Sequence, residues 1–144
     1  RLGVDIRMNT KVTPEMIEEI KPHTVMNAIG AESIIPPIPG VDKAFVKDSH
    51  DVLDGKAEAT GNVVVIGGGM VGMETAEYLA EKGAKVSVLE MLPDICSDMG
   101  TTRKICMGEE IQKSGIIPVT SVKVTEIGDN VVIGEKDGEK VEFP

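Results

Sequence analysis

Three glycines and one acid have the types and the spacing to bind a nucleotide. Gly67, Gly69 and Gly72 follow the pattern G-x-G-x-x-G, and Glu90 comes 23 residues after the first of them. In this pattern the first glycine permits a tight turn, the second lets the backbone approach a pyrophosphate, and the third lets a helix pack closely on a strand. A carboxylate about 20 residues further on accepts hydrogen bonds from ribose hydroxyls. The expected chemistry is recognition of an adenosine dinucleotide.

Two strands and a helix must position these residues. Residues 63–66 form an apolar run that ends at glycine, which is typical of a strand buried on both faces of a parallel sheet. Residues 70–82 have helical periodicity, and Gly83 is a candidate C-terminal cap. One face of this helix is apolar: Met73, Ala76, Leu79 and Ala80. Residues 86–89 predict a second strand that ends at Glu90. A pyrophosphate would then lie on the free N–H groups and the positive dipole end of the helix.

Glu90 also favours NAD(H) over NADP(H). A 2′-phosphate would meet this carboxylate as a like charge, and Met91 supplies no compensating cation. Arg103 and Lys104 come later and are the residues that could reach such a phosphate. The agreement of strand, helix, second strand and acid argues against a glycine turn that merely packs a helix. FAD and S-adenosylmethionine remain alternative adenosine ligands for the same architecture.

Length and charge narrow the class of protein. The 144 residues are enough for one domain with a real core. The net charge of -9, from 24 acids and 15 bases, argues against nucleic acid or an anionic membrane as a partner. No apolar run approaches the roughly 20 residues that span a bilayer, and no signal peptide is visible. These features predict a cytoplasmic protein.

The cysteines and histidines predict neither a metal site nor a redox site. Cys96 and Cys106 lack C-x-x-C and zinc-ligand spacing, so we interpret both as reduced packing residues. His23 and His50 have no partner motif, and we interpret both as surface or loop histidines.

Turn and cap residues predict the remaining elements. Thr13 and Pro14 suit the N-cap and first position of a short helix over residues 14–21. Asp48 or Ser49 caps a helix to Leu53, and Thr101 or Thr102 caps one that runs to about Ser114. The predicted strands are residues 3–13 (with a turn), 24–29, 116–119, 122–127, 130–133 and 140–143. The predicted irregular segments are the proline-rich linker 34–42, the loops 57–61 and 91–100, and the turns 128–130 and 136–138.

An internal repeat predicts the domain organisation. Residues 3–13 align without gaps on residues 115–125, and both copies end in Lys-Val-Thr. The simplest account is two successive dinucleotide-binding domains, of which the chain holds the late part of the first and most of the second. We therefore predict the remnant of a first dinucleotide-binding domain with its linker over residues 1–45 and an NAD(H)-binding domain over residues 46–144, truncated before its last strand. The family resemblance described below implies that the first of these is an FAD-binding domain. The strand 24–29 is expected to take the place of that missing strand. The predicted fold is α/β, a Rossmann-like parallel sheet flanked by helices with a small antiparallel three-stranded β layer.

Residues 63–100 resemble a known family, the FAD-dependent pyridine nucleotide oxidoreductases. The marks are Gly-Gly-Gly-Met-Val-Gly at 67–72, Glu-Met-Leu-Pro at 90–93 and the run 51–69. Within the family the chain is most similar to the C-terminal part of 2-enoate reductase and 2,4-dienoyl-CoA reductase, a group that includes NADH oxidases and NADH:flavin oxidoreductases. The likeness covers nearly the whole chain.

The resemblance implies a role in hydride transfer. In the family an N-terminal barrel with FMN reduces the alkene beside an iron–sulfur cluster, and the C-terminal part passes hydride from the nicotinamide to FAD. The barrel, the cluster cysteines and the FAD fingerprint are absent from this sequence, so partners would be the flavin and barrel domains of a longer chain. We expect the fragment alone to be inactive and to hold no FAD.

The resemblance also implies residue roles. Glu74 matches a position near the nicotinamide, or else is an acid that favours the helix N-terminus. The family's Ala-Thr-Gly beside FAD is Ala28-Ile29-Gly30 here, which lacks the hydroxyl. No catalytic residue is predicted. The predicted cofactor-binding residues are Gly67, Gly68, Gly69, Met70, Val71, Gly72, Glu74, Glu90, Met91 and Val124. Alternatives are an NADH module of a disulfide- or peroxide-reducing flavoenzyme, and a non-catalytic nucleotide-binding module.

Overall fold

The computed structural model describes residues 2–97 and 99–144, which fall into two units that divide between Glu32 and Ser33. Residues 91–97 and 99–100 are irregular, as predicted for the loop 91–100, and Asp98 lies outside the described residues. Arg1 of the predicted first domain also lies outside them.

The first unit contains one helix, α1 (Pro14–Ile20). The Thr13 hydroxyl accepts the Met16 N–H at 3.4 Å, and Lys21 ends the helix in a left-handed conformation, so the predicted cap and helix are confirmed. The predicted strands 3–13 and 24–29 are wrong, because the described part of this unit contains no strand. Its apolar side chains stay exposed, for example Leu2 at 98% and Ile29 at 90%. Strands need a paired neighbour and a buried face, and these segments have neither.

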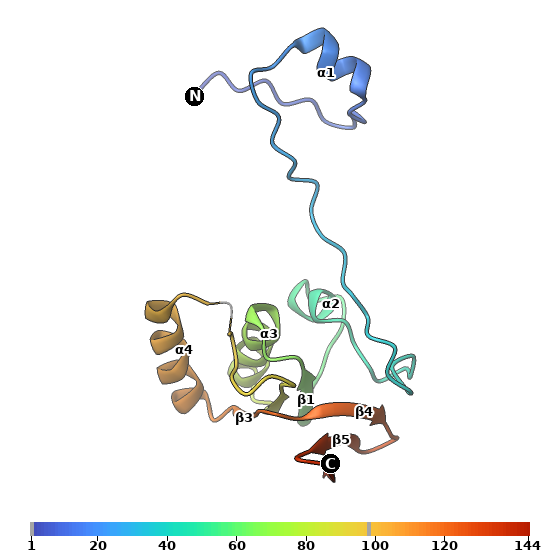
Figure 1. Cartoon of the computed structure of the whole chain (residues 1–144), viewed down its shortest axis with the longest axis vertical. Coiled ribbons are helices and arrows are strands. Elements are labelled where there is room, and N and C mark those ends of the chain that lie inside the picture. Colours follow the sequence, from blue (N-terminus) through green and yellow to red (C-terminus); the bar gives the residue numbers. More distant parts are fainter. Residues whose placement is uncertain (1, 98) are drawn as a thin grey trace. The chain divides into compact units, whose positions relative to one another are not determined.

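The second unit contains a parallel sheet with the strand order β1-β2-β3. Its strands are β1 (Asn62–Ile66), β2 (Lys85–Leu89) and β3 (Ile117–Val119). Its helices are α2 (Ser49–Leu53), α3 (Met70–Glu81) and α4 (Thr101–Ser114). Figure 1 shows α2, α3 and α4 on one face of this sheet. The predicted strand–helix–strand unit is confirmed, and no strand from residues 24–29 joins it.

Burial within the parallel sheet differs from the prediction. The central strand β2 carries the buried residues Val86, Val88 and Leu89. The predicted two-sided burial of residues 63–66 is wrong, because β1 is an edge strand whose valines are half-buried and whose Ile66 is exposed.

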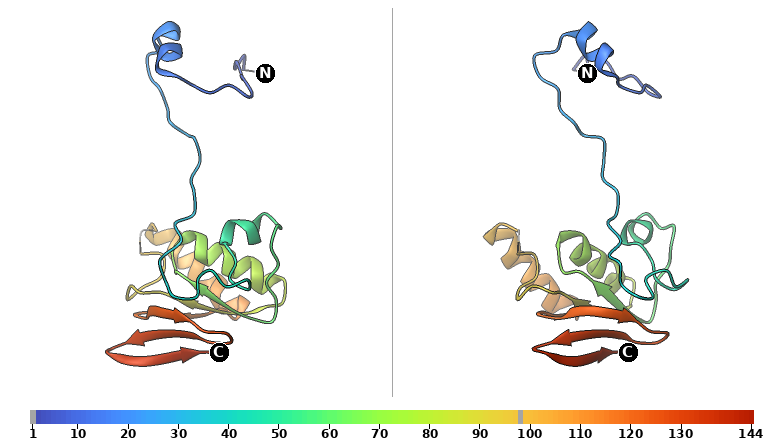
Figure 2. Two further views of the ribbon diagram at one scale, coloured as in Figure 1. Left: turned by 90° about the vertical axis from the view of Figure 1, so that its right-hand side faces the viewer. Right: turned by 45° about the vertical axis from the view of Figure 1, so that its right-hand side comes forward.

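A second, antiparallel sheet packs on the other side. It contains β4 (Lys123–Ile127), β5 (Val132–Lys136) and β6 (Glu139–Phe143) in that order. Asp137 and Gly138 connect the last two with φ of 53° and 81°, the signature of a type I′ hairpin turn. Both views in Figure 2 place this sheet on the face opposite the helices. The predicted α/β fold with a small antiparallel layer is thus confirmed.

The caps of the helices are set by local residues. Asp48 caps α2 by accepting the His50 N–H at 2.8 Å, as predicted. Gly115 is the C-cap of α4, and Gly83 directly follows Lys82, the C-cap of α3. Both glycines have positive φ. The prediction that a threonine caps α4 is wrong, because Gly100 occupies the N-cap without a side-chain hydrogen bond and Thr101 is the first helical residue.

The proline-rich segment is irregular as predicted, but it is anchored. The Ile127 N–H donates to the Pro39 carbonyl at 2.8 Å, and Lys43 pairs with Asp129 at 2.6 Å. A Cβ on Gly40 would lie 2.1 Å from the Ile127 carbonyl oxygen, so glycine is required there. Residues 39–43 are therefore bound to the edge strand β4 and to the turn that follows it.

The internal repeat is visible in the backbone. Gly3 and its counterpart Gly115 have φ of 73° and 70°, and Asn9 and its counterpart Ser121 have φ of 53° and 58°. The second copy contains β3, whereas the first contains no strand. The two copies therefore share the bend but not the strand. The predicted domain boundary at residue 45 stays a prediction.

The core lies between α3, the parallel sheet and α4. Met73 is fully buried at 0% exposure, and Met70 on the same helix is 46% exposed. The other members of the core cluster are Val52, Ala76, Leu79, Val86, Val88, Cys96, Met107, Ile111 and Ile116.

Met73→Ala is expected to lower the free energy of unfolding by about 2–5 kcal/mol, because it leaves a cavity beneath α3. Met70→Ala, the matched control on the same helix, is expected to cost less than about 1 kcal/mol. Urea denaturation measures both, and equal losses would contradict the assignment of Met73 to the core.

Candidate dinucleotide-binding site

The turn between β1 and α3 depends on two of its glycines. Gly67 has φ of 104°, which other residues rarely adopt, and its N–H donates to the Leu89 carbonyl at 2.8 Å. A Cβ on Gly72 would lie 1.9 Å from the Gly67 carbonyl oxygen. The predicted tight turn at Gly67 and close packing at Gly72 are both confirmed.

The N-terminus of α3 has the features of an anion site. Gly69 is its N-cap, and no side chain caps this end. The first intrahelical bond runs from the Met73 N–H to the Gly69 carbonyl at 3.0 Å, so the N–H groups of residues 70–72 have no carbonyl one turn back. A Cβ built on Gly69 meets no atom within 4 Å, so the space above the turn is open. Open space, free amides and the helix dipole suit a pyrophosphate.

Glu90 stands at the carboxyl end of β2 and is bound to the glycine turn. Its Oε2 accepts the Gly68 N–H at 2.7 Å, and its Oε1 accepts the Leu92 N–H at 2.7 Å. Its backbone also accepts the Val122 N–H at 2.9 Å. The carboxylate therefore lies directly beside the turn, half-buried and held by two backbone amides.

The loop after Glu90 braces the turn from the other side. The Cys96 N–H donates to the Gly68 carbonyl at 2.8 Å, and Cys96 has a left-handed conformation with φ of 47°. A Cβ on Gly68 would lie 3.0 Å from both Glu90 Cβ and Ile95 Cγ2. Sequence reasoning missed the contacts of Leu92 and Cys96, because they are backbone contacts that residue type does not encode.

The other predicted residues lie at different distances from this centre. Met70 and Val71 are exposed in the first turn of α3, and Met91 is exposed beside Glu90. Glu74 is exposed one turn further along α3. Val124 lies on β4 opposite Gly134, two residues after the segment that contacts Glu90.

The two cations that could reach a 2′-phosphate both have acidic partners. Arg103 Nη2 lies 3.8 Å from Glu74 Oε1, and Lys104 pairs with Asp94. These ion pairs are weak because their groups are exposed to solvent. Neither cation contacts Glu90.

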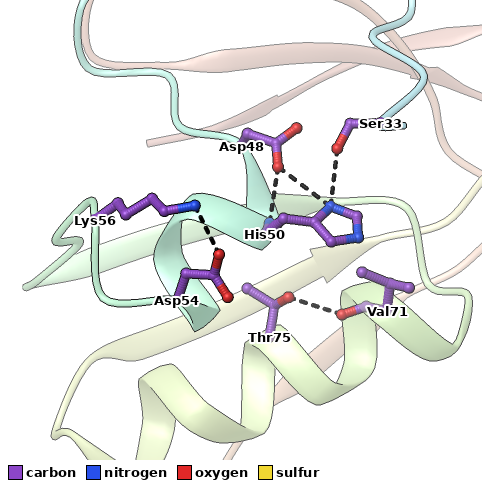
Figure 3. Close-up of polar contacts among 7 residues, drawn as sticks. All are labelled: Ser33, Asp48, His50, Asp54, Lys56, Val71 and Thr75. Atoms are coloured by element: carbon purple, nitrogen blue, oxygen red, sulfur yellow. Dashed lines mark hydrogen bonds and ion pairs between the residues drawn. The ribbon is translucent and has the colours of Figure 1, made fainter. Parts of the chain in front are cut away.

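Helix α2 lies beside α3, and each helix has polar contacts of its own (Figure 3). The Thr75 hydroxyl, on the one buried polar residue of the described core, donates to the Val71 carbonyl at 2.7 Å. Ser33 Oγ lies 2.8 Å from His50 Nδ1, and Asp48 Oδ1 lies 3.3 Å from the same nitrogen. Because both partners contact one nitrogen, these residues are no Ser-His-Asp relay. The hydrogen bond with Ser33 lowers the pKa of Asp48.

Acidic side chains gather between α3 and α4. Partial burial, and then the neighbouring carboxylates of Glu110 and Glu81, raise the pKa of Glu77, while Arg103 opposes the shift. Glu77, Glu81 and Glu110 therefore form a cluster of negative charge beside α3.

The remaining surface features do not coincide with the turn. Two hollows are lined by residues 5–20 and 125–140, and neither includes a glycine-turn residue. The described residues contain no cluster of metal ligands, and none of the helices among them has both the length and the apolar character of a membrane span.

The predictions for cysteines and histidines have mixed outcomes. Cys96 packs in the core as predicted, but Cys106 is exposed. Its position immediately before the buried Met107 turns it about 100° away from the core. Neither cysteine forms a disulfide. His23 and His50 are exposed, as predicted.

A parallel β-α-β unit with a glycine turn, an uncapped helix N-terminus and an acid after the second strand defines the Rossmann class of dinucleotide-binding folds. Residues 1–143 match the model of the family described as pyridine nucleotide-disulphide oxidoreductase. The chain belongs to this family of FAD-dependent oxidoreductases, whose members use a flavin and a pyridine nucleotide.

Named relatives agree with the resemblance seen in the sequence. The chain is 41% identical over 143 residues to bilirubin reductase of Mediterraneibacter gnavus, covering 99% of this chain and 22% of the relative. It is 45% identical over 131 residues to NADH oxidase of Thermoanaerobacter brockii, covering 88% and 20%. A solved complex of 2-naphthoyl-CoA reductase with 2-naphthoyl-CoA has a TM-score of 0.79 and 32% identity, covering 96% and 21%. The chain thus spans about a fifth of the length of these proteins.

A pH series tests the acidic cluster. Because the folded-state pKa of Glu77 is raised above 4.5, the folded chain binds more protons than the unfolded chain above that pH. The protonated Glu77 therefore contributes stability at low pH, and this contribution is lost as the pH rises through the raised pKa of the folded state.

Glu77→Gln is expected to become more stable relative to wild type as the pH rises from below 4.5 to 7, as measured by urea unfolding. Glu109→Gln, which removes an exposed carboxylate from α4, is the matched control. A constant difference between wild type and Glu77→Gln across this range would contradict the raised pKa.

Proposed function

We propose that this chain is the NADH-binding part of a larger flavoenzyme, and that it positions the nicotinamide for hydride transfer to a flavin held elsewhere in that enzyme. The observation that carries the proposal is the conjunction of free amides at the α3 N-terminus with the Glu90 carboxylate beside the same turn.

Each part of the site has a distinct task. The N–H groups of Met70, Val71 and Gly72 would bind the pyrophosphate, and Glu90 would accept the ribose hydroxyls. Met91 and Val124 would contact the adenosine half by their apolar surfaces, and Glu74 would lie toward the nicotinamide. When bound, the nucleotide supplies the hydride, and the chain supplies binding and orientation.

The relatives support this role at the level of chemistry. Their names include an NADH oxidase, a bilirubin reductase and a cinnamate reductase, all of which are redox proteins. We propose that the larger enzyme is an NADH oxidase or an enoate-type reductase, with FAD, and with FMN and an iron–sulfur cluster outside this chain. We also propose a cytoplasmic location for the larger enzyme.

Cofactor preference is expected to favour NADH. Calorimetric titration of the chain should give a dissociation constant at least about tenfold lower for NADH than for NADPH, because the 2′-phosphate would face Glu90 as a like charge. The reverse order would mean that Arg103 or Lys104 outweighs Glu90. Binding of neither nucleotide would refute the proposed function.

Gly69→Ala is expected to weaken NADH and NADPH alike, on the order of tenfold, because its Cβ would enter the open space above the turn. Since that Cβ meets no protein atom, the free energy of unfolding should change little. Unaltered affinity for NADH in this variant would place the pyrophosphate elsewhere.

A further inference from the structure

The carboxylate of Glu90 is already engaged before any ligand arrives. Its two oxygens each accept one backbone N–H, from Gly68 and from Leu92, and both distances are 2.7 Å. Such lengths are typical of charge-assisted hydrogen bonds, which are stronger than neutral ones. The side chain is therefore fixed in orientation by atoms on both sides of it.

The second glycine of the turn determines where that carboxylate lies. Gly68 is a variable position in the G-x-G-x-x-G pattern, and its φ is not positive, so backbone strain does not demand glycine there. It is buried, and an added Cβ would lie 3.0 Å from Glu90 Cβ and 3.0 Å from Ile95 Cγ2. Any larger residue at position 68 must displace the acid or the loop behind it.

From these contacts we infer that Gly68 and the Leu92 amide are positioning groups that hold Glu90 against the ribose end of the site, and that discrimination between NADH and NADPH depends on this clamp as well as on the charge. The inference rests on the proposed function, since it concerns the nucleotide that the site selects.

The clamp has a clear physical effect on selectivity. Each carboxylate oxygen has more than one acceptor site, so an oxygen that binds an amide can still accept a ribose hydroxyl. A free glutamate could rotate away from a 2′-phosphate, whereas a clamped one must break two hydrogen bonds to do so. Holding the acid in place therefore makes the like charge unavoidable for NADPH.

The first experiment measures the clamp without nucleotide. Amide hydrogen exchange by NMR is compared among the wild-type chain, Glu90→Gln and the control Glu109→Gln. A glutamine has one carboxamide oxygen where the acid has two, so the Gly68 amide, the Leu92 amide or both should exchange roughly tenfold faster than in wild type and in the control. Unchanged exchange of both amides in Glu90→Gln would overturn the inference.

The second experiment keeps the acid and moves it. In Gly68→Ala the ratio of the NADPH to the NADH dissociation constant is expected to fall several-fold toward one, because the new Cβ would press on Glu90 Cβ and on the Ile95 loop behind it and so shift the carboxylate. In Gly69→Ala both constants should rise and the ratio should stay that of wild type. A wild-type ratio in Gly68→Ala would overturn the inference.

The two experiments separate this inference from the proposed function. If the wild-type chain binds neither nucleotide, the proposed function fails, and the exchange rates still decide whether Glu90 is clamped. If wild type prefers NADH and Gly68→Ala keeps that preference, the proposed function stands and the clamp plays no part in selectivity.

Discussion

The nucleotide-binding unit depends on the close approach of Gly72 to the carbonyl oxygen of Gly67. No side chain fits between them, so α3 begins directly under the turn. The Gly67 N–H continues the pairing of β1 with β2 by donating to Leu89. Because parallel strands end at one edge of the sheet, the turn, the helix N-terminus and Glu90 are brought to the same place. One backbone contact thus determines where a dinucleotide could lie.

Features encoded by neighbouring residues were predictable from the sequence. The Thr13-Pro14 helix start, the Asp48 cap, the Gly115 stop and the Asp137-Gly138 turn each depend on side chains or glycines within a few positions. The glycine turn and its acid belong to the same class, because their spacing reflects one strand, one helix and one more strand. The order of elements in the second unit follows from these signals, and the candidate site follows from the elements.

Features that depend on distant partners were not predictable. Residues 24–29 have strand-forming types but no strand beside them, and β1 has a core-like sequence but lies at an edge. Gly68 occupies an unconstrained position of the motif, and only the packing of Glu90 and Ile95 explains it. The left-handed backbone of Cys96 likewise has no local signal, since glycine or asparagine would be the ordinary residue there. In each case tertiary contact, not residue type, decides the outcome.

The anchored linker has a mechanical consequence. Residues 39–43 are fastened to the antiparallel sheet through Pro39, Gly40 and Lys43, so tension on the chain just before residue 39 is carried to β4 through these contacts, while Ser33 shares it with α2 through His50. Contacts on β4 and α2, rather than on the glycine turn, therefore bear such tension first.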